Sequence, residues 1–398
     1  MSLTLPKLAC PATGEPFLTA VSLAEWLEQS AIERDRSGGT PKAERDVIRE
    51  SGLLTLSIPR AYGGLGATWA ETMMTVRVLA RADSSIAHVY AFHHLMLATV
   101  RLFGEPSQWQ GYFTRTVDEN LFWGNALNPL DTRTTCEVRD GGLEFHGHKS
   151  FCSGGLDSDM LIVSARQDGH NQLMIAAIPT NRDGITLHED WDNIGQRQTD
   201  SGSATFSRVR VEHSEILQNP GPLGNLFATL RPLIAQLMLS NIYLGIAEGA
   251  FKAAKHYTHE HARRWLLSNA NSQAEDPYVL ERCGEFWIAL EAARALNERA
   301  AMLLDANWRH SNALSDNERA ATAIAIATAK VTSIKGAFEV TNRMFDIMGA
   351  RSTSARFGFD RYWRNLRTHS SHDPVDYKMS ELGDWALNSR EPIPTFYS

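Results

Sequence analysis

Residues 317–349, NERAATAIAIATAKVTSIKGAFEVTNRMFDIMG, form the longest regular pattern in the chain. One row of apolar side chains repeats every seven residues at Ile324, Val331, Phe338 and Phe345. A second row, interrupted by Thr341, follows the same spacing at Ala327, Ile334 and Met348. Two such rows line one face of a helix, so the segment predicts a long helix packed in a bundle.

Upstream of this helix, short apolar runs replace the helical pattern. They are LEFHGHKSF (143–151), MLIVSA (160–165), QLMIAAIP (172–179) and ATFSRVRV (204–211). Short runs rich in β-branched residues and bounded by Gly, Asp and Asn predict strands of a compact antiparallel β domain. No glycine-rich dinucleotide-binding fingerprint follows any of them.

From about residue 20 to residue 120 the apolar spacing is again helical, with turn signals at SGG and YGGLG. We therefore expect a mostly α fold with a central β domain. The expected units are an N-terminal helical domain at 1–120, the β domain at 121–222, and a C-terminal helical bundle with a tail at 223–398.

Composition excludes several classes of function. The 398 residues are 43% hydrophobic and 21% charged, with a net charge of −7, which argues against nucleic acid as a ligand. The four cysteines are far apart and form no CxxC pair, so we expect neither a metal site nor a disulfide framework. The N-terminus has no signal-peptide pattern, and no apolar run predicts a membrane span. We expect a soluble, cytoplasmic protein.

Two long segments carry a resemblance to a known family. GLLTLSIPRAYGGLG (52–66) and IGQRQTDSGSATFSRVRVEHSEIL (194–217) are similar, in the same order, to patterns of the acyl-CoA dehydrogenase family. The resemblance implies an N-terminal helical domain, a β-barrel-like middle domain, a C-terminal four-helix bundle and a homotetramer. Three further segments resemble the flavin-dependent monooxygenase branch of that fold, typified by dibenzothiophene monooxygenase: 151–159, 190–203 and 360–378.

That branch implies a two-component enzyme. Reduced FMN would react with O2 to give a C4a-hydroperoxide, which oxygenates the sulfur of a small organosulfur compound. The substrate would be a dibenzothiophene-like thioether or an alkyl sulfone or sulfinate, and the residues do not decide between them. Because no nicotinamide fingerprint is present, a separate NAD(P)H flavin reductase must supply the reduced FMN.

Two other functions stay open. One is an acyl-CoA dehydrogenase that uses FAD, with Asp373 at the position of the family's catalytic glutamate. The other is a flavin-fold protein that binds a ligand or partner without catalysis.

Four residues are expected to lie around the flavin ring. Phe151 and Ser153 match positions at which the family holds the ring, and a hydroxyl can donate or accept there. Asn125 and Trp191 match positions on the flavin and substrate side. Ser153 could instead cap a turn, and Trp191 could be a core aromatic.

Asp83, Ser84 and Ser85 predict the start of a helix through SIAHVYAFHHLML. On that helix His88 and Phe92 are four apart and share one face, which looks onto the substrate in the resembling enzymes. Phe92 lacks the hydroxyl of the tyrosine usual there. We expect the next two histidines, His93 and His94, to face solvent.

The stretch RTHSSHDPVDYK (367–378) holds the last candidates. Asp373 and Pro374 predict a helix start, with Asp373 as the N-cap and Pro374 as the first helical residue. His372 would then lie before a helix N-terminus, which favours a neutral imidazole able to move a proton.

A phosphate of FMN needs cationic partners. By resemblance, Arg351 and His369 match positions near that phosphate, while Arg263 and Arg264 follow the place of a family arginine that is His261 here. Guanidinium forks suit a single phosphate. Exposed arginines are also commonly solvated without a ligand.

Overall fold

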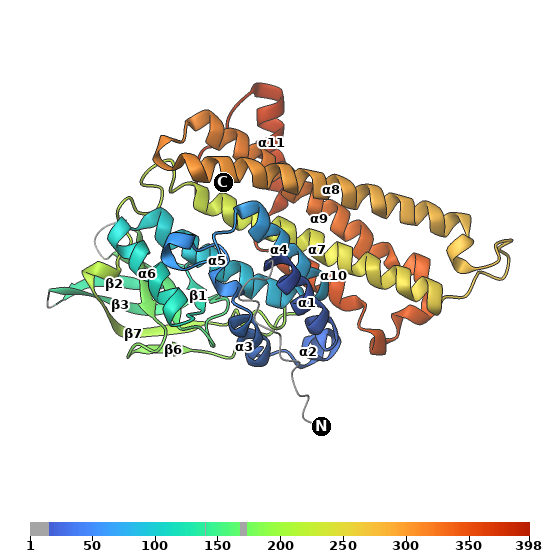
Figure 1. Ribbon diagram of the computed structural model, residues 1–398, viewed down its shortest axis with the longest axis horizontal. Helices are drawn as coiled ribbons and strands as arrows, with labels where there is room; N and C mark the ends of the chain where they lie inside the picture. Colours follow the sequence, from blue (N-terminus) through green and yellow to red (C-terminus); the bar gives the residue numbers. More distant parts are fainter. Residues whose placement is uncertain (1–15, 140, 168–172) are drawn as a thin grey trace.

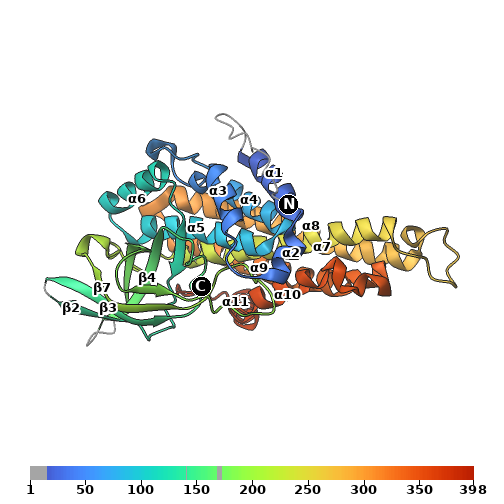
Figure 2. The same ribbon diagram turned by 90° about the horizontal axis from the view of Figure 1, so that it is seen from below.

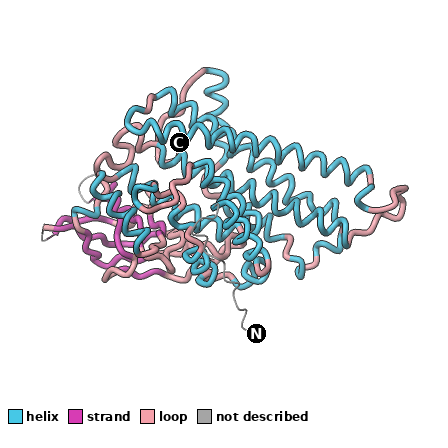
Figure 3. The backbone as a smooth tube through the Cα atoms, in the orientation of Figure 1, coloured by secondary structure: helices cyan, strands magenta, loops and turns pink. Residues whose placement is uncertain are grey.

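The computed structural model describes residues 16–139, 141–167 and 173–398. Residues 1–15 of the expected first domain, Asp140 and Gln172 lie outside the described residues. The strands gather at one end of the molecule, and three long helices run from there to the other end (Figures 1 and 3). The expected mostly α fold with a central β domain is confirmed.

The N-terminal helices precede the sheet. They are α1 (Pro16–Glu28), α2 (Ala31–Ser37), α3 (Lys42–Glu50), α4 (Trp69–Ala82), α5 (Ser84–Phe103) and α6 (Pro106–Asp118). Asp83 caps α5, because its carboxylate accepts from the backbone N–H groups of Ser85 and Ile86. The helix start predicted at this aspartate is confirmed, which fixes where His88 lies.

The sheet has seven strands in the order β1-β4-β2-β3-β7-β6, with β5 paired to β4. The strands are β1 (Trp123–Ala126), β2 (Thr135–Arg139), β3 (Gly142–Lys149), β4 (Met160–Gln167), β5 (Leu173–Pro179), β6 (Ile185–Leu187) and β7 (Ala204–Val211). The prediction of a purely antiparallel domain was wrong, because β1 and β2 both run parallel to β4. Neither strand is joined to β4 by a tight turn, because β3 and the segment 150–159 come before β4, and this permits parallel pairing.

The bundle contains α7 (Leu230–Glu260), α8 (Pro277–His310) and α9 (Asp316–Met348), followed by α10 (Asp360–Ser370) and α11 (Val375–Asn388). Helix α9 matches the pattern predicted at 317–349. Helix α7 packs closely on α4, since a Cβ at Gly249 would lie 2.2 Å from the carbonyl oxygen of Arg81. Among the described residues α7 alone has the length and hydropathy of a membrane span, and 94% of that window is buried inside the structure.

Helix α5 is the centre of the N-terminal helices (Figure 2). Every residue of α5 except Arg101 is buried. The expectation that His93 and His94 face solvent was therefore wrong. His93 Nε2 lies 2.8 Å from the carbonyl oxygen of Leu54, and His94 Nδ1 lies 2.8 Å from Ser57 Oγ. Burial lowers the pKa of His93 to about 3, so both rings are neutral parts of the core.

A buried arginine joins the N-terminal helices to the sheet. Arg45 of α3 is fully buried, and its Nε lies 3.1 Å from Asp157 Oδ2 while its Nη1 lies 3.5 Å from Asp200 Oδ2. Its Nη2 donates to the carbonyl oxygens of Asp157 and Gly154 at 2.7 and 3.1 Å. The guanidinium also stacks on Phe122 at 4.2 Å. One side chain thus fixes two separate loops of the middle region.

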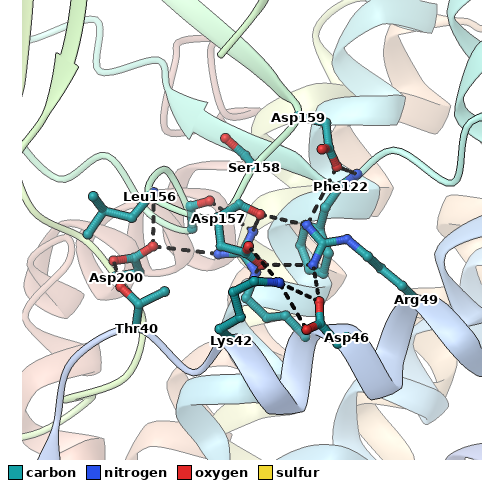
Figure 4. Close-up of polar contacts among 12 residues, drawn as sticks. Thr40, Lys42, Asp46, Arg49, Phe122, Leu156, Asp157, Ser158, Asp159 and Asp200 are labelled. Atoms are coloured by element: carbon teal, nitrogen blue, oxygen red, sulfur yellow. Dashed lines mark hydrogen bonds and ion pairs between the residues drawn. The ribbon is translucent and has the colours of Figure 1, made fainter. Parts of the chain in front are cut away.

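Further charged side chains surround Arg45 and its two carboxylates, Asp157 and Asp200 (Figure 4). Arg49 Nη1 lies 2.8 Å from Asp157 Oδ2, and Lys42 Nζ lies 2.8 Å from Asp46 Oδ1. The Lys42 side chain is 64% exposed, whereas that of Arg45 is 0% exposed. This network of ion pairs therefore extends from the solvent-exposed Lys42 to the fully buried Arg45.

We expect Arg45→Met to destabilise the fold by about 3–5 kcal/mol, because it leaves the buried carboxylate of Asp200 without its cation. Thermal unfolding followed by circular dichroism measures this. Lys42→Met is the matched control, since it removes a cation from the exposed edge of the same network and should leave the midpoint unchanged. Equal midpoints for Arg45→Met and the wild type would contradict the assigned role.

Candidate functional site

A cavity of about 680 Å³ lies between the middle region and the helices. Its wall comes from α5, the segment after β1, the turn after β3, the 191–201 loop, the start of α7, the end of α10 and the C-terminal tail. This volume suits a ligand of cofactor size. Eight predicted site residues line it: His88, Phe92, Asn125, Phe151, Ser153, Trp191, His369 and His372.

A chain of hydroxyl groups runs along one wall. His88 Nε2 lies 3.0 Å from Ser153 Oγ, which lies 2.8 Å from Ser201 Oγ. Ser201 Oγ donates to Thr199 Oγ1 at 2.8 Å, and Thr199 Oγ1 donates to the carbonyl oxygen of Gln196 at 3.0 Å. Each hydroxyl can both donate and accept, so the chain couples the hydrogen bonding of His88 to that of the 191–201 loop.

Backbone hydrogen bonds place these hydroxyls. The N–H of Asn125 in β1 donates to the carbonyl oxygen of Ser153 at 2.9 Å, and the N–H of Gly154 donates to that of Thr199 at 2.9 Å. The loop also rests on α10, where Gln196 N–H donates to Asn365 Oδ1 at 2.7 Å. Gly195 permits this contact, since a Cβ there would lie 2.2 Å from a backbone oxygen of α10. The wall is thus built on rigid elements.

Two histidines meet inside the cavity. The rings of His88 and His369 are 4.8 Å apart and perpendicular, and Phe92 lies 4.0 Å from His88 on the other side. Burial, together with the charge of His372, lowers the pKa of His88 to about 3. Burial also holds the pKa of His369 well below its usual range. Both rings are therefore neutral at physiological pH and can exchange hydrogen bonds without carrying charge.

Asp373 does not cap a helix, so that prediction was wrong. Helix α11 begins at Val375, with Pro374 before it as the cap residue and no side-chain cap bond. The Asp373 carboxylate instead binds Lys330 Nζ at 2.6 and 2.8 Å, and its Oδ1 lies 3.1 Å from His372 Nδ1. Burial raises the pKa of Asp373, but His372 and Lys330 together hold it well below its ordinary value. The carboxylate is an ion-pair partner that orients His372.

Aromatic side chains form another part of the cavity wall. Phe151 adopts a left-handed backbone conformation with φ of 60°, and its ring contacts Trp191 edge-on at 6.1 Å. The indole Nε1 of Trp191 donates to the carbonyl oxygen of Gln196 at 2.7 Å. Trp191 is therefore both packed and exposed to the cavity, which combines the two interpretations that the sequence left open.

The three predicted phosphate-binding arginines lie elsewhere. Arg263 and Arg264 follow the end of α7, and Arg264 Nη1 donates to the carbonyl oxygen of Ser268 at 2.8 Å. Arg351 lies in η6 (Ala350–Thr353), directly after α9. A 31-residue helix is about 45 Å long, so these residues are at the opposite end of α7 from the cavity. Within one chain they do not meet the other site residues, and their role stays a prediction.

Sequence reasoning missed several cavity residues. Ser201 and Thr199 lie within the segment 194–217 that carries the family resemblance, but the sequence assigned no function to either residue. Arg231, which lines the cavity, and Lys330, which binds Asp373, were not predicted. A lysine within the apolar pattern of α9 and an arginine at the start of the apolar α7 are signals of a buried charge that needs a partner. Tyr397 of the tail also lines the cavity.

The cavity fits a flavin. His369 is 94% buried, and neither of its ring nitrogens has a hydrogen-bond partner among the described residues. His88 Nδ1 is also without one. Buried polar atoms nearly always have a hydrogen-bond partner, so unpaired nitrogens on residues that line a cavity favour a ligand there. Neutral imidazoles, hydroxyls and aromatic faces together match the polar edge and flat rings of a flavin.

Comparisons with known proteins agree with this geometry. Profiles of the acyl-CoA dehydrogenase family match the N-terminal domain at residues 21–120, the middle domain at 124–209 and the C-terminal domain at 237–377. The probable FMNH2-dependent monooxygenase SfnC of Pseudomonas putida is 60% identical over 95% of this chain and 96% of its own length.

Solved structures give the same result. Methanesulfinate monooxygenase MsuC of Pseudomonas fluorescens is 60% identical, with a TM-score of 0.96 over 97% of this chain and 100% of that one. The FMN-bound structure of the dibenzothiophene monooxygenase TdsC of Paenibacillus sp. A11-2 is 40% identical, with a TM-score of 0.92 over 96% and 100% of the two chains. The family resemblance carried by residues 52–66 and 194–217 is confirmed. The chain belongs to the acyl-CoA dehydrogenase family and, within it, to the branch of flavin-dependent monooxygenases.

Proposed function

We propose that this protein is the oxygenase of a two-component system that uses reduced FMN and O2 to oxygenate the sulfur of a small organosulfur compound. The observation that carries the proposal is the pair of neutral, buried histidines joined to a hydroxyl chain in the wall of one cavity. The relatives named as FMNH2-dependent, dibenzothiophene and methanesulfinate monooxygenases support it.

Reduced FMN would supply the activation of O2, and the chain's own residues supply the environment. Ser153 and Asn125 would hydrogen-bond the polar edge of the ring, and Phe151 and Trp191 would cover its face. His88 can donate or accept a hydrogen bond through Nε2 as a neutral imidazole, because burial lowers its pKa to about 3. Phe151 is 59% exposed, so the aromatic wall would exclude water, which diverts reduced flavin to hydrogen peroxide, only once flavin and substrate are bound.

The alternative acyl-CoA dehydrogenase activity needs a free carboxylate base. Asp373 occupies the matching position, but two contacts to Lys330 and one to His372 hold its oxygens. A carboxylate with a depressed pKa is a weak base. These contacts favour oxygenation, with His372 as the group presented to the cavity.

We also infer that the protein is a homo-oligomer. Helix α8 exposes an apolar face made of Leu280, Trp287, Ile288 and Met302. Exposed apolar patches of this kind mark protein interfaces. A second copy would also explain Arg263, Arg264 and Arg351, since they could reach the phosphate of an FMN bound in a neighbouring cavity. The tetramer of the family is the expected form.

The central experiment combines the purified protein with a generic flavin reductase, NADH, FMN and a panel from dibenzothiophene to methanesulfinate. We expect at least one substrate to gain one oxygen atom, read by mass spectrometry, only when the protein is present. Reductase, NADH and FMN alone are the control. No oxygenated product, together with anaerobic bleaching of bound flavin by an acyl-CoA, would overturn the proposal in favour of a dehydrogenase.

Ser153→Ala should lower the oxygenation rate by about 100-fold, the lower range of the contribution that a positioned proton-transfer group makes. It removes the hydroxyl between His88 and Ser201, so hydrogen peroxide per NADH consumed should rise. Ser158→Ala is the matched control: its hydroxyl bonds to Gly155 and Thr180 outside the cavity. Unchanged coupling in Ser153→Ala would contradict the role of this hydroxyl.

Charges placed on the α8 face should break the oligomer. We expect Trp287→Glu/Ile288→Glu to reduce the mass in solution, measured by light scattering, and to weaken FMN binding, while leaving the helical circular dichroism signal intact. Tyr377→Glu, an exposed aromatic on α11, is a control away from that face. A wild-type monomer that binds FMN tightly would refute the oligomer proposal.

A further inference from the structure

One buried arginine in the cavity has no anionic partner. Arg231, the second residue of α7, is 8% exposed and lines the cavity. Within the described parts of the chain its guanidinium makes one hydrogen bond, from Nε to Thr99 Oγ1 at 3.2 Å. The two terminal nitrogens, which form the fork of the side chain, have no assigned partner.

Other buried arginines have partners within the chain. Arg319 and Arg361 donate to the backbone oxygens of Thr229 and Gly358, and three others pair with carboxylates. Arg34, Arg45 and Arg77 are 7%, 0% and 6% exposed. They pair with Asp83 at 2.6 Å, Asp157 at 3.1 Å and Glu298 at 3.4 Å, respectively. A buried cation without an ion-pair partner is costly. An arginine that stays unpaired in a cavity therefore points to an anion supplied from outside the chain.

The charge of Arg231 persists at neutral pH. Burial lowers its pKa to about 10, which leaves the guanidinium protonated. The nearby phenol of Tyr397 is uncharged at that pH, because burial raises its pKa. The carboxylate of Asp373 is already bound by Lys330. Two other charged side chains, Asp192 and Arg367, line the same cavity, and among the described residues neither forms an ion pair with Arg231.

The geometry points to a specific substrate class: we propose that Arg231 binds the acid group of the substrate, and that this substrate is a small organic sulfinate. The inference rests on the proposed oxygenase function and narrows it. The two oxygens of a sulfinate match the two terminal nitrogens of a guanidinium fork. A neutral thioether would leave the cation without a partner.

The reaction balances for this substrate. A sulfinate, RSO2⁻, gains one oxygen atom of O2 at sulfur and becomes the sulfonate RSO3⁻, so sulfur is oxidised. The second oxygen atom leaves as water with the two hydrogens of reduced FMN, which becomes oxidised FMN. The negative charge stays on the organic acid throughout, so its partner Arg231 need not change protonation.

The C-terminal tail limits the size of that acid. Phe396 and Tyr397 line the cavity, and the carbonyl oxygen of Ser398 accepts from Arg319 Nη2 at 2.5 Å. Ser398 Oγ also accepts from Lys378 Nζ at 3.1 Å. The anchored tail brings two aromatic rings to the cavity that contains Arg231, so the space around the cation suits a small molecule.

The test compares the wild type with Arg231→Met, Arg231→Lys and the control Arg101→Met. Arg101 lies on α5 over the ring of Trp109 and outside the cavity. Binding of methanesulfonate, an anion resembling the product, is measured by calorimetry with oxidised FMN present. Turnover of methanesulfinate and of dibenzothiophene is measured with reduced FMN, and thermal midpoints verify folding.

Arg231→Met should weaken methanesulfonate binding by about 10- to 100-fold, the range of a hydrogen-bonded charge contact. The KM for methanesulfinate should rise by a similar factor, without a matching loss for neutral dibenzothiophene. Arg231→Lys should fall between, since it keeps the charge without the fork. Arg101→Met should bind as the wild type does.

The outcomes separate this inference from the proposed function. Unchanged methanesulfonate binding in a folded Arg231→Met would overturn the anion site while oxygenation of other panel members stands. Equal losses of turnover with methanesulfinate and with dibenzothiophene in Arg231→Met would also overturn the anion site, because Arg231 would then have a structural role. Methanesulfonate binding that needs Arg231, with no oxygenation of any compound, would support the anion site and refute the oxygenase.

Discussion

The burial of Arg45 is the constraint on which the site depends. Its guanidinium joins Asp157 and Asp200, two carboxylates that belong to different loops of the middle region. These loops flank Ser153 and Ser201, whose hydroxyls lie 2.8 Å apart. A buried cation that pairs with two carboxylates accepts only a narrow range of positions for them. The spacing of the hydroxyl chain is therefore set from α3, outside the cavity.

A second buried ion pair, Lys330–Asp373, changes the chemistry available at the position of the dehydrogenases' catalytic carboxylate. Lys330 binds both oxygens of Asp373, at 2.8 and 2.6 Å, and this pair lies next to His372. In a dehydrogenase, a carboxylate at this position must be free to take a proton. Here the lysine makes it a fixed acceptor, and its remaining contact orients an imidazole. The ion pair with Lys330 of α9 thus keeps Asp373 from acting as a base, and Asp373 positions His372 instead.

Sequence could predict the elements that depend on local periodicity. Helix α9, the capped start of α5 and four of the strands follow from residue spacing and capping chemistry. It could not predict contacts between distant segments. The parallel pairing of β2 with β4 involves residues about thirty positions apart, and the Lys330–Asp373 pair spans 43. The prediction that His93 and His94 face solvent was wrong for a related reason. A helix that is buried on all sides has no polar face from which its orientation could be predicted.

The site residues also divide into those that the sequence could predict and those that it could not. Positions carried by the family resemblance, such as Ser153 and His88, lie in the cavity, whereas Arg231 belongs to no recognised motif. An unpaired buried cation works against stability, so an arginine that lines a cavity without an ion-pair partner among the described residues calls for a functional reason. The hydroxyl chain and the histidines can serve any sulfur oxygenation. Arg231 adds a charge that favours one class of substrate, and thus separates the chemistry of the site from its specificity.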